Sequence, residues 1–288
     1  MIVIMGASGT IGQALLQRLG ELGVPARALG REPEKLHAQI KSYGWPHIEA
    51  AYADAADSES LHRAFVGASQ LFLVLSNSPA QIKLETSVIH QAVETGIEHI
   101  VKISSPAFHP SAPVAVAGWH QEIERNLAES GITHTVLRPY AFMQNLLRFG
   151  PTIAAEEVFF GAMGQTACNF VDCRDIADVA AEALTNREAT GRVYTLTGSE
   201  TFSYPQIADK LSVVLARPIR YINLYTEVLR RDLIERGGMP SWLANHVVEI
   251  QAMAIALPET PTDDVARLLG RAPRTLDAFL REHAGHFR

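Results

Sequence analysis

Three glycines, spaced three residues apart, follow a short apolar run near the start of the chain. Residues 2–5 read Ile-Val-Ile-Met and lead directly into Gly6-Ala-Ser-Gly9-Thr-Ile-Gly12. Residues 11–22 then carry isoleucine and leucine at the spacing of an amphipathic helix. Strand, glycine turn and helix in this order are the setting in which such glycines bind the pyrophosphate of a dinucleotide. The alternative is an ordinary strand-to-helix turn that happens to be rich in glycine.

Each part of this turn has a physical task in a dinucleotide site. One glycine makes the tight turn, one lets backbone N–H groups approach the pyrophosphate, and one lets helix and strand pack closely. The helix N-terminus adds the positive end of its dipole beneath the phosphates. We therefore expect the cofactor to contact Gly6, Ser8, Gly9, Thr10, Ile11 and Gly12.

Strand-like and helix-like segments alternate up to Pro139. The segment at residues 70–76 is apolar on both faces, which is typical of a central parallel strand. Alternation of this kind predicts an α/β fold, a Rossmann-like doubly wound parallel sheet with helices on both faces. The expected strands are 2–5, 24–30, 47–54, 70–76, 99–105 and 133–139, and the expected helices are 11–22, 32–43, 57–66, 79–95 and 119–130.

The pattern changes in the second half of the chain. Short strands are expected at 168–172, 192–197 and 220–224, residues 156–165 are expected to be irregular, and the chain is mostly helical from Thr226. We therefore predict a Rossmann domain over residues 1–150. Residues 151–288 should form a smaller, mostly helical substrate-binding cap that partly returns to the sheet.

Composition excludes several classes of protein. The chain of 288 residues is 47% hydrophobic and 19% charged, with a net charge of −6, which disfavours a nucleic-acid surface. No apolar run approaches the roughly 18 residues that a membrane span needs. Two cysteines in a chain of this length suit a reducing compartment and make neither a disulfide framework nor a metal site. We expect a cytoplasmic protein without a metal, acting as a monomer or homodimer on a small molecule.

The end of the second strand indicates which nucleotide binds. A carboxylate there would bind a ribose 2′-hydroxyl and repel a 2′-phosphate. The chain instead has Arg31, whose fork of donors suits a phosphate, and Lys35 one helical turn later. Glu32 beside Arg31 opposes this interpretation, and a solvated loop cation is the alternative. The sequence favours NADP(H) over NAD(H).

Other polar residues follow the later strands, where ligands of parallel sheets bind. Asp54 accepts from an adenine amino group or, equally, caps the next helix. Ser76 and Asn77 are expected beside the nicotinamide ribose, and Ser104 with Ser105 belongs to the same edge.

An ordered series of motifs resembles the NmrA-like branch of the atypical short-chain dehydrogenase/reductase family, over nearly the whole chain. The motifs are Gly6-Ala-Ser-Gly-Thr-Ile-Gly12, Arg31-Glu-Pro-Glu-Lys35-Leu, Asp54, His120-x-x-Ile-Glu124, Arg138-Pro-Tyr-Ala-Phe-Met-Gln-Asn145, Val171-Asp-x-x-Asp175-Ile-Ala177 and Tyr194-x-Leu-Thr-Gly198. The resemblance implies a Rossmann-like domain that binds NADP(H). Members of this family include NADPH-dependent quinone oxidoreductases and triphenylmethane-dye reductases, and also non-catalytic sensors of the nucleotide.

One departure from the wider dehydrogenase superfamily bears on the reaction. Those enzymes use a Tyr-x-x-x-Lys pair as a proton relay to a carbonyl, yet residues 106–138 contain neither tyrosine nor lysine. The helix offers His120 and Glu124 on one face instead. Hydride transfer from NADPH to a flat, electron-poor acceptor such as a quinone, imine or dye needs less acid assistance. The proton then comes from His120 or from water, unless His120 is only a polar helix residue.

Residues of the substrate pocket are harder to assign. Tyr140 and Phe142 follow the sixth strand and either line the pocket or pack in the core. Lys102 is expected to point out of the sheet, away from substrate, and Asn145 to tie its helix to a neighbouring loop. Further aromatic residues either form a pocket for a flat substrate or fill the core: Trp119, Phe149, Phe159 and Phe160. An NADPH-dependent reductase is the leading function, a nucleotide sensor without turnover the alternative, and a sugar-nucleotide epimerase the least favoured.

Overall fold

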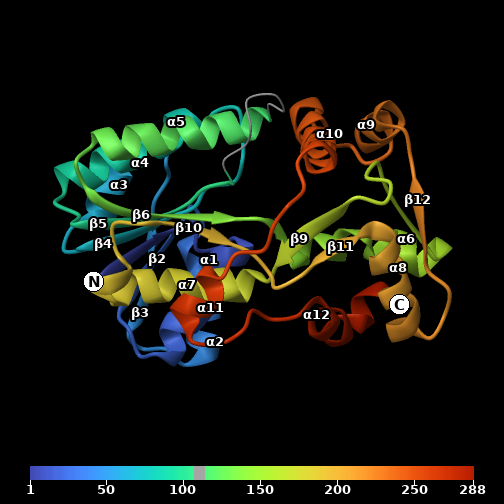
Figure 1. The fold of residues 1–288 in the computed structure, drawn as a ribbon. Helices are drawn as coiled ribbons and strands as arrows, with labels where there is room; N and C mark the ends of the chain where they lie inside the picture. The colour runs from blue at the N-terminus through green and yellow to red at the C-terminus, as the bar shows by residue number, and fades with distance from the viewer. Residues whose placement is uncertain (107–113) are drawn as a thin grey trace.

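Seven parallel strands form the central sheet of the protein. A computed structural model describes residues 1–106 and 114–288 (Figure 1). The strand order is β10-β6-β5-β4-β1-β2-β3, so the direction of winding reverses between β1 and β4. The strands are β1 (Ile2–Met5), β2 (Ala26–Gly30), β3 (Ile48–Tyr52), β4 (Gln70–Leu73), β5 (His99–Ile103), β6 (Thr133–Pro139) and β10 (Val193–Leu196). This confirms the predicted Rossmann-like sheet.

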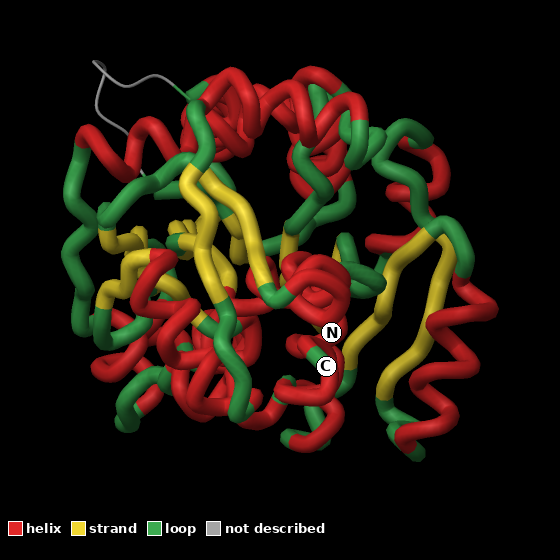
Figure 2. Tube along the Cα trace, turned by 90° about the vertical axis from the view of Figure 1, so that its right-hand side faces the viewer, coloured by secondary structure: helices red, strands yellow, loops and turns green. Residues whose placement is uncertain are grey.

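Helices cover both faces of this sheet. In Figure 1, α3, α4 and α5 lie above it, and α1, α2, α7 and α11 lie below it. The view in Figure 2, turned by 90°, also shows helices on both sides of the strands. The helices are α1 (Thr10–Glu21), α2 (Pro33–Tyr43), α3 (Ser58–Phe65), α4 (Gln81–Glu94), α5 (Ala115–Glu129), α7 (Cys173–Thr185) and α11 (Asp264–Leu269).

Side chains along each strand alternate between the two helical layers, as the period of a β-strand requires. Ile2 and Ile4 pack with the leucines of α1 and the small residues of α7. Val3 and Met5 pack in the other layer, with α3, α4 and α5. Burial on both faces explains why these strands read as continuous apolar runs.

The seventh strand comes from the second half of the chain. β10 pairs in parallel with the edge of β6, and α7 packs along α1 beneath the sheet. Residues 173–196 therefore add the seventh strand to the sheet and a helix to the layer beneath it.

The remaining residues form a smaller part beside the carboxyl end of β6. It holds two small sheets, β11-β9-β7 and β12-β8. Residues 156–165, expected to be irregular, contain the strand β8, which pairs in parallel with β12. The elements are β7 (Ala141–Phe142), η1 (Met143–Phe149), α6 (Gly150–Glu156), β8 (Val158–Gly161), β9 (Ala167–Val171), β11 (Thr201–Ser203), α8 (Tyr204–Leu215), β12 (Arg220–Asn223), α9 (Thr226–Glu235), α10 (Ser241–Ala256), α12 (Leu276–Glu282) and η3 (Ala284–Phe287). The short helix η2 (Arg187–Ala189) lies between α7 and β10, in the larger part.

Aromatic rings fill the core of this smaller part. Phe149 stacks on Phe159 with 4.9 Å between ring centroids, and Tyr204 and Tyr221 pack edge-on or tilted around them. Phe159 is fully buried. The pocket hypothesis for Phe149 and Phe159 is therefore replaced by a core role. Across residues 1–106 and 114–288, no helix is both long and apolar enough to traverse a bilayer.

Candidate functional site

The glycine turn between β1 and α1 is closely packed at two of its three glycines. Gly6 has φ +90°, and a Cβ atom there would lie 2.0 Å from the carbonyl oxygen of Val74. At Gly12 a Cβ atom would lie 2.2 Å from the carbonyl oxygen of Gly6. Neither position accepts a side chain, because both contacts are with backbone. Gly6 lets the turn pack against the end of β4, and Gly12 lets the first turn of α1 pack against the glycine turn.

Gly9 differs from its neighbours, because a Cβ atom there would meet its nearest atom at 3.4 Å. Gly9 is the N-cap of α1, with no side-chain hydrogen bond at the cap. Ser8, Gly9 and Thr10 are exposed, whereas Ile11 and Gly12 are buried under the turn. The first N–H groups of α1 are thus not capped by a side chain, which is the arrangement that binds phosphate.

Two cations follow β2. Lys35 forms an ion pair with Glu32 at 2.7 Å, with both side chains largely exposed. Arg31 is also exposed, and no ion pair or hydrogen bond of its guanidinium is found among residues 1–106 and 114–288. Arg31 is therefore available for an anion, while Lys35 has a competing carboxylate.

Polar residues also follow β3 and β4. One Asp54 carboxylate oxygen accepts from the N–H of Ala56 at 2.9 Å, and the cap of α3 is made by Asp57. Asp54 thus shapes the turn before the helix and has a second oxygen left for a ligand. Ser76 is exposed and Asn77 is half-buried directly after β4. All these residues follow the carboxyl ends of parallel strands, on the side of the sheet where ligands of such folds bind, and the winding reverses between β1 and β4.

Ser104 ties β5 to the neighbouring helix. Its hydroxyl donates to the carboxylate of Glu124 in α5, and Arg138 at the end of β6 donates two hydrogen bonds to the same carboxylate. The carboxylate of Glu124 thus links the ends of β5 and β6 to α5, and this is a structural role.

His120 lies on a buried polar cluster between β5, α4 and α5. Its Nδ1 atom is 3.5 Å from the Nζ of Lys102, which forms an ion pair with Glu85 at 2.5 Å. The side chain of Lys102 points from the sheet toward α4, where it pairs with Glu85. It is fully buried beside His120 and does not reach solvent. Burial, the charge of Lys102 and His246 of α10 hold the pKa of His120 well below its ordinary value of 6.5. His120 is therefore a neutral imidazole at neutral pH.

Tyr140 and Phe142 follow β6 at the junction with the smaller part. Phe142 is partly buried against the apolar core under the sheet. Burial and the nearby Glu259 raise the pKa of Tyr140, so its hydroxyl stays protonated. Burial raises the pKa of Glu259 to about 7, although its carboxylate accepts from the N–H of Asn169.

Trp119 of α5 lies against Trp242 of α10, with 6.0 Å between the ring centroids.

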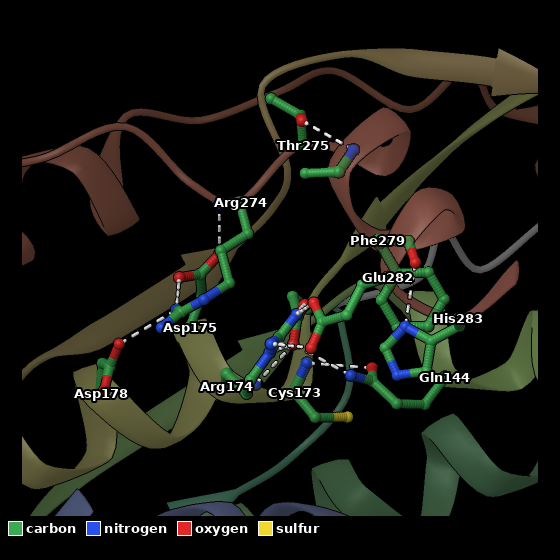
Figure 3. Close-up of polar contacts among 12 residues, drawn as sticks. Gln144, Cys173, Arg174, Asp175, Asp178, Arg274, Thr275, Phe279, Glu282 and His283 are labelled. Carbon is green, nitrogen blue, oxygen red and sulfur yellow. Dashed lines mark hydrogen bonds and ion pairs between the residues drawn. The ribbon is translucent and has the colours of Figure 1, made fainter.

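The residues of the later family motifs form a clamp between α7 and the end of the chain (Figure 3). Asp172 caps α7 and accepts from Gln144 at 2.9 Å, and Gln144 also accepts from the N–H of Cys173. The link expected of Asn145 is thus made by its neighbour Gln144, whereas Asn145 is exposed. Asp175 accepts hydrogen bonds from Arg271 and Arg274.

Sequence patterns missed the buried cluster at His120 and the carboxyl group of Glu259. Glu85 and Gln81 lie one turn apart on α4, at a spacing typical of a solvated face, and both are fully buried. Glu259 lies in the loop after α10 with no motif around it. Only the packing of distant elements shows their surroundings.

Three comparisons with known proteins bear on this site. The NAD(P)H azoreductase of Xenophilus azovorans is 31% identical over the whole chain and 99% of its own length. The (4-alkanoyl-5-oxo-2,5-dihydrofuran-3-yl)methyl phosphate reductase of Streptomyces griseus is 33% identical over the whole chain and 99% of its own length. The NADPH-dependent quinone oxidoreductase of Escherichia coli, solved in complex with NADPH, has a TM-score of 0.85 and 27% identity, with 99% of each chain covered.

The family of this protein is shown by a match of its sequence to a family model along most of the chain. Residues 1–280 match the NmrA-like family, and the matched range includes every motif described above. This protein belongs to the NmrA-like family.

Proposed function

We propose that this protein is an NADPH-dependent reductase of small, flat, electron-poor acceptors such as quinones and azo or imine dyes. The observation that carries the proposal is the uncapped N-terminus of α1 at the glycine turn, with the exposed Arg31 at the end of the next strand. The similar azoreductase, furan-phosphate reductase and quinone oxidoreductase support the reaction class.

The residues of the site fit the cofactor. The N–H groups of α1 would bind the pyrophosphate, and Arg31 the 2′-phosphate, with Lys35 in a secondary role because of Glu32. Asp54, Ser76, Asn77 and Ser104 would border the adenine, ribose and nicotinamide positions along the strand ends. When bound, NADPH supplies a hydride at its nicotinamide ring.

Within this proposal His120 has the task of providing the proton that follows the hydride. A neutral imidazole donates from its single N–H and needs no positive charge to do so. The usual tyrosine and lysine are absent from the helix, and the carboxylate of Glu124 is already bound to Ser104 and Arg138, which leaves His120 as the candidate proton donor of α5. Tyr140 and Phe142 would contact the acceptor.

The choice of cofactor is tested with Arg31→Ala. We expect its affinity for NADPH to fall about tenfold to a hundredfold while its affinity for NADH is unchanged, because a charge-assisted bidentate contact is lost. Lys41→Ala, which replaces an exposed lysine in the last turn of α2, is the control and should change neither affinity. Equal losses for NADPH and NADH in Arg31→Ala would contradict the preference.

Turnover is tested by following NADPH oxidation at the nicotinamide absorbance with a panel of quinones and dyes. We expect oxidation above background with at least one azo dye or quinone. Tight NADPH binding without oxidation by any acceptor would instead favour a nucleotide sensor, the alternative function within this family. We further infer a cytoplasmic protein, since both cysteines are free and buried. We infer the lack of nucleic-acid contacts from the net charge of −6, and we expect a monomer or homodimer.

A further inference from the structure

A fully buried ion pair lies on the α4 and α5 side of the sheet. Lys102 of β5 and Glu85 of α4 are both 0% exposed, with 2.5 Å between Nζ and Oε2. Burying two charges costs several kcal/mol for each, and apolar residues of similar volume are often as stable or more so. Stability alone is therefore a weak reason for this pair, and its neighbours suggest another.

The ammonium of Lys102 has three acceptors around it. It donates to Glu85 and, at 2.8 Å, to the carbonyl oxygen of Ile103, and its third contact is Nδ1 of His120 at 3.5 Å. Gln81 donates to the other Glu85 oxygen at 2.8 Å. Both carboxylate oxygens are thus occupied, which fixes the carboxylate and, through it, the direction of the ammonium.

This arrangement selects one tautomer of His120. A lysine ammonium has donors and no acceptor, so the Nδ1 atom that faces it must be the unprotonated nitrogen. The proton of the neutral ring is then on Nε2, on the other side of the ring. The 3.5 Å separation is long for a hydrogen bond, as such contacts often are before a substrate is bound.

The charged and titratable groups around His120 come from three other elements. Lys102 is on β5, Glu85 is on α4 and His246 is on α10. The next turn of α5 contributes Glu124, which is already bound to Ser104 and Arg138. Lys102 is therefore the one cation of this group in contact with the ring.

We propose that the Lys102–Glu85 pair supplies, through His120, the proton that completes reduction of the acceptor. This inference rests on the proposed reductase function. After the acceptor has taken the hydride, its anionic atom takes the Nε2 proton of His120, and Nδ1 takes a proton from Nζ of Lys102. Two N–H bonds break, one bond to the acceptor and one Nδ1–H bond form, and Lys102 is left neutral beside Glu85.

The cycle closes with water. Once product has left, Nε2 of His120 takes a proton from a water molecule, whose hydroxide leaves to solvent, and the Nδ1 proton returns to Lys102, where the charge of Glu85 favours the ammonium. Glu85 and Gln81 are positioning residues in this scheme. Lys102 is a relay residue that acts through His120 and does not touch the acceptor.

Two acceptors that differ in their need for a proton test the relay. Reduction of an azo bond by hydride leaves an anionic nitrogen that must be protonated, whereas a triarylmethane cation takes a hydride to give a neutral product with no proton. With Lys102→Met we expect azo turnover to fall about a hundredfold, the usual size of a general-acid contribution. Turnover of the cationic dye should stay within about twofold.

The control is Lys83→Met, an exposed lysine on α4 close to Glu85 in the chain, which should change neither reaction. An equal loss with both dyes in Lys102→Met would overturn the relay, because it would show a structural role. A wild type that binds NADPH and reduces neither dye contradicts the proposed reductase function, and the relay with it. That failure is recognisable because the wild type itself is inactive.

A second measurement needs no variant and so does not depend on the folding of Lys102→Met. The nitrogen-15 resonances of His120 in the wild-type protein at neutral pH report its tautomer. We expect unprotonated Nδ1 and protonated Nε2. The opposite tautomer, or a doubly protonated ring, would overturn the relay.

Discussion

A methyl group added to Gly12 would lie 2.2 Å from the carbonyl oxygen of Gly6, whereas one added to Gly9 would meet the same oxygen at 3.4 Å. The same motif thus contains residues with different tasks. Gly12 lets the first turn of α1 pack on the chain that leaves β1. Gly9 keeps the surface over the helix N-terminus free of side-chain atoms, which matters only when a phosphate approaches.

Alanine substitutions should separate these tasks. We expect Gly12→Ala to lower the free energy of unfolding by about 2–3 kcal/mol, because backbone must move to accept the methyl group. Gly9→Ala should stay within about 0.5 kcal/mol of the wild type but bind NADPH about tenfold more weakly. Urea unfolding and cofactor titration measure the two effects. If Gly9→Ala were as unstable as Gly12→Ala, the distinction would be wrong.

Residues of the site differ in how far the sequence could predict them. The glycine turn is local, so its spacing carries the geometry. Lys102 is different, because its partners Glu85 and His120 lie on two other elements and a lone lysine in an apolar strand resembles a solvent-facing position. Only the packing of α4 and α5 over β5 shows that this lysine is buried.

The alternation of strand-like and helix-like segments in the sequence predicted the elements of the central sheet. It predicted the elements of the smaller part less well. Each central strand is flanked by glycine or a helix cap and is buried on both faces, which gives a strong signal. β8 and β11 are short, and each pairs with a segment far along the chain. Their pairing partners decide their conformation, so local pattern was a poor guide there.

Helix α7 is held to the last part of the chain by Asp175, which is fully buried and forms ion pairs with Arg271 and Arg274. Figure 3 shows its contact with Arg274. It accepts from the side chains of Arg271 and Arg274 and from the N–H of Arg274 at 2.7 Å. Asp178, one turn on, shares both arginines but is 15% exposed. The clamp therefore fixes the segment that leads into α12.

Asp175→Asn should lower the free energy of unfolding by roughly 3 kcal/mol, because two guanidinium groups lose a buried charged partner. Limited proteolysis should also become faster between α11 and α12. Asp178→Asn is the matched control and should cost clearly less, because its carboxylate is 15% exposed and keeps some contact with solvent. Equal effects of the two substitutions, measured by urea unfolding, would argue against the clamp.

The molecule as a whole buries several histidines in neutral form. Burial, with a smaller effect of His134, lowers the pKa of His99 to about 4, and burial lowers that of His246 to about 4. The pKa of His120 is lowered as well. In the unfolded chain these rings have ordinary pKa values near 6.5. Between pH 6.5 and 4 the unfolded state therefore binds more protons, so acid favours unfolding.

We expect the free energy of unfolding to fall steadily as pH drops from 6.5 towards 4. His99→Gln should make this fall shallower, because glutamine retains polar contacts to Gln70 and Thr135 but binds no proton. Urea unfolding at a series of pH values measures the slope. Parallel curves for wild type and His99→Gln would exclude His99 as a source of acid sensitivity.

The position of β10 at the open side of β6 has a consequence for synthesis on the ribosome. β6 is complete at Pro139, but the strand that covers its edge is not made until residues 193–196, after α7. During that interval the nascent chain presents an unpaired strand edge and an apolar sheet face that lacks α7. Such surfaces are prone to aggregation, so the speed at which residues 140–196 are translated should influence the yield of folded protein.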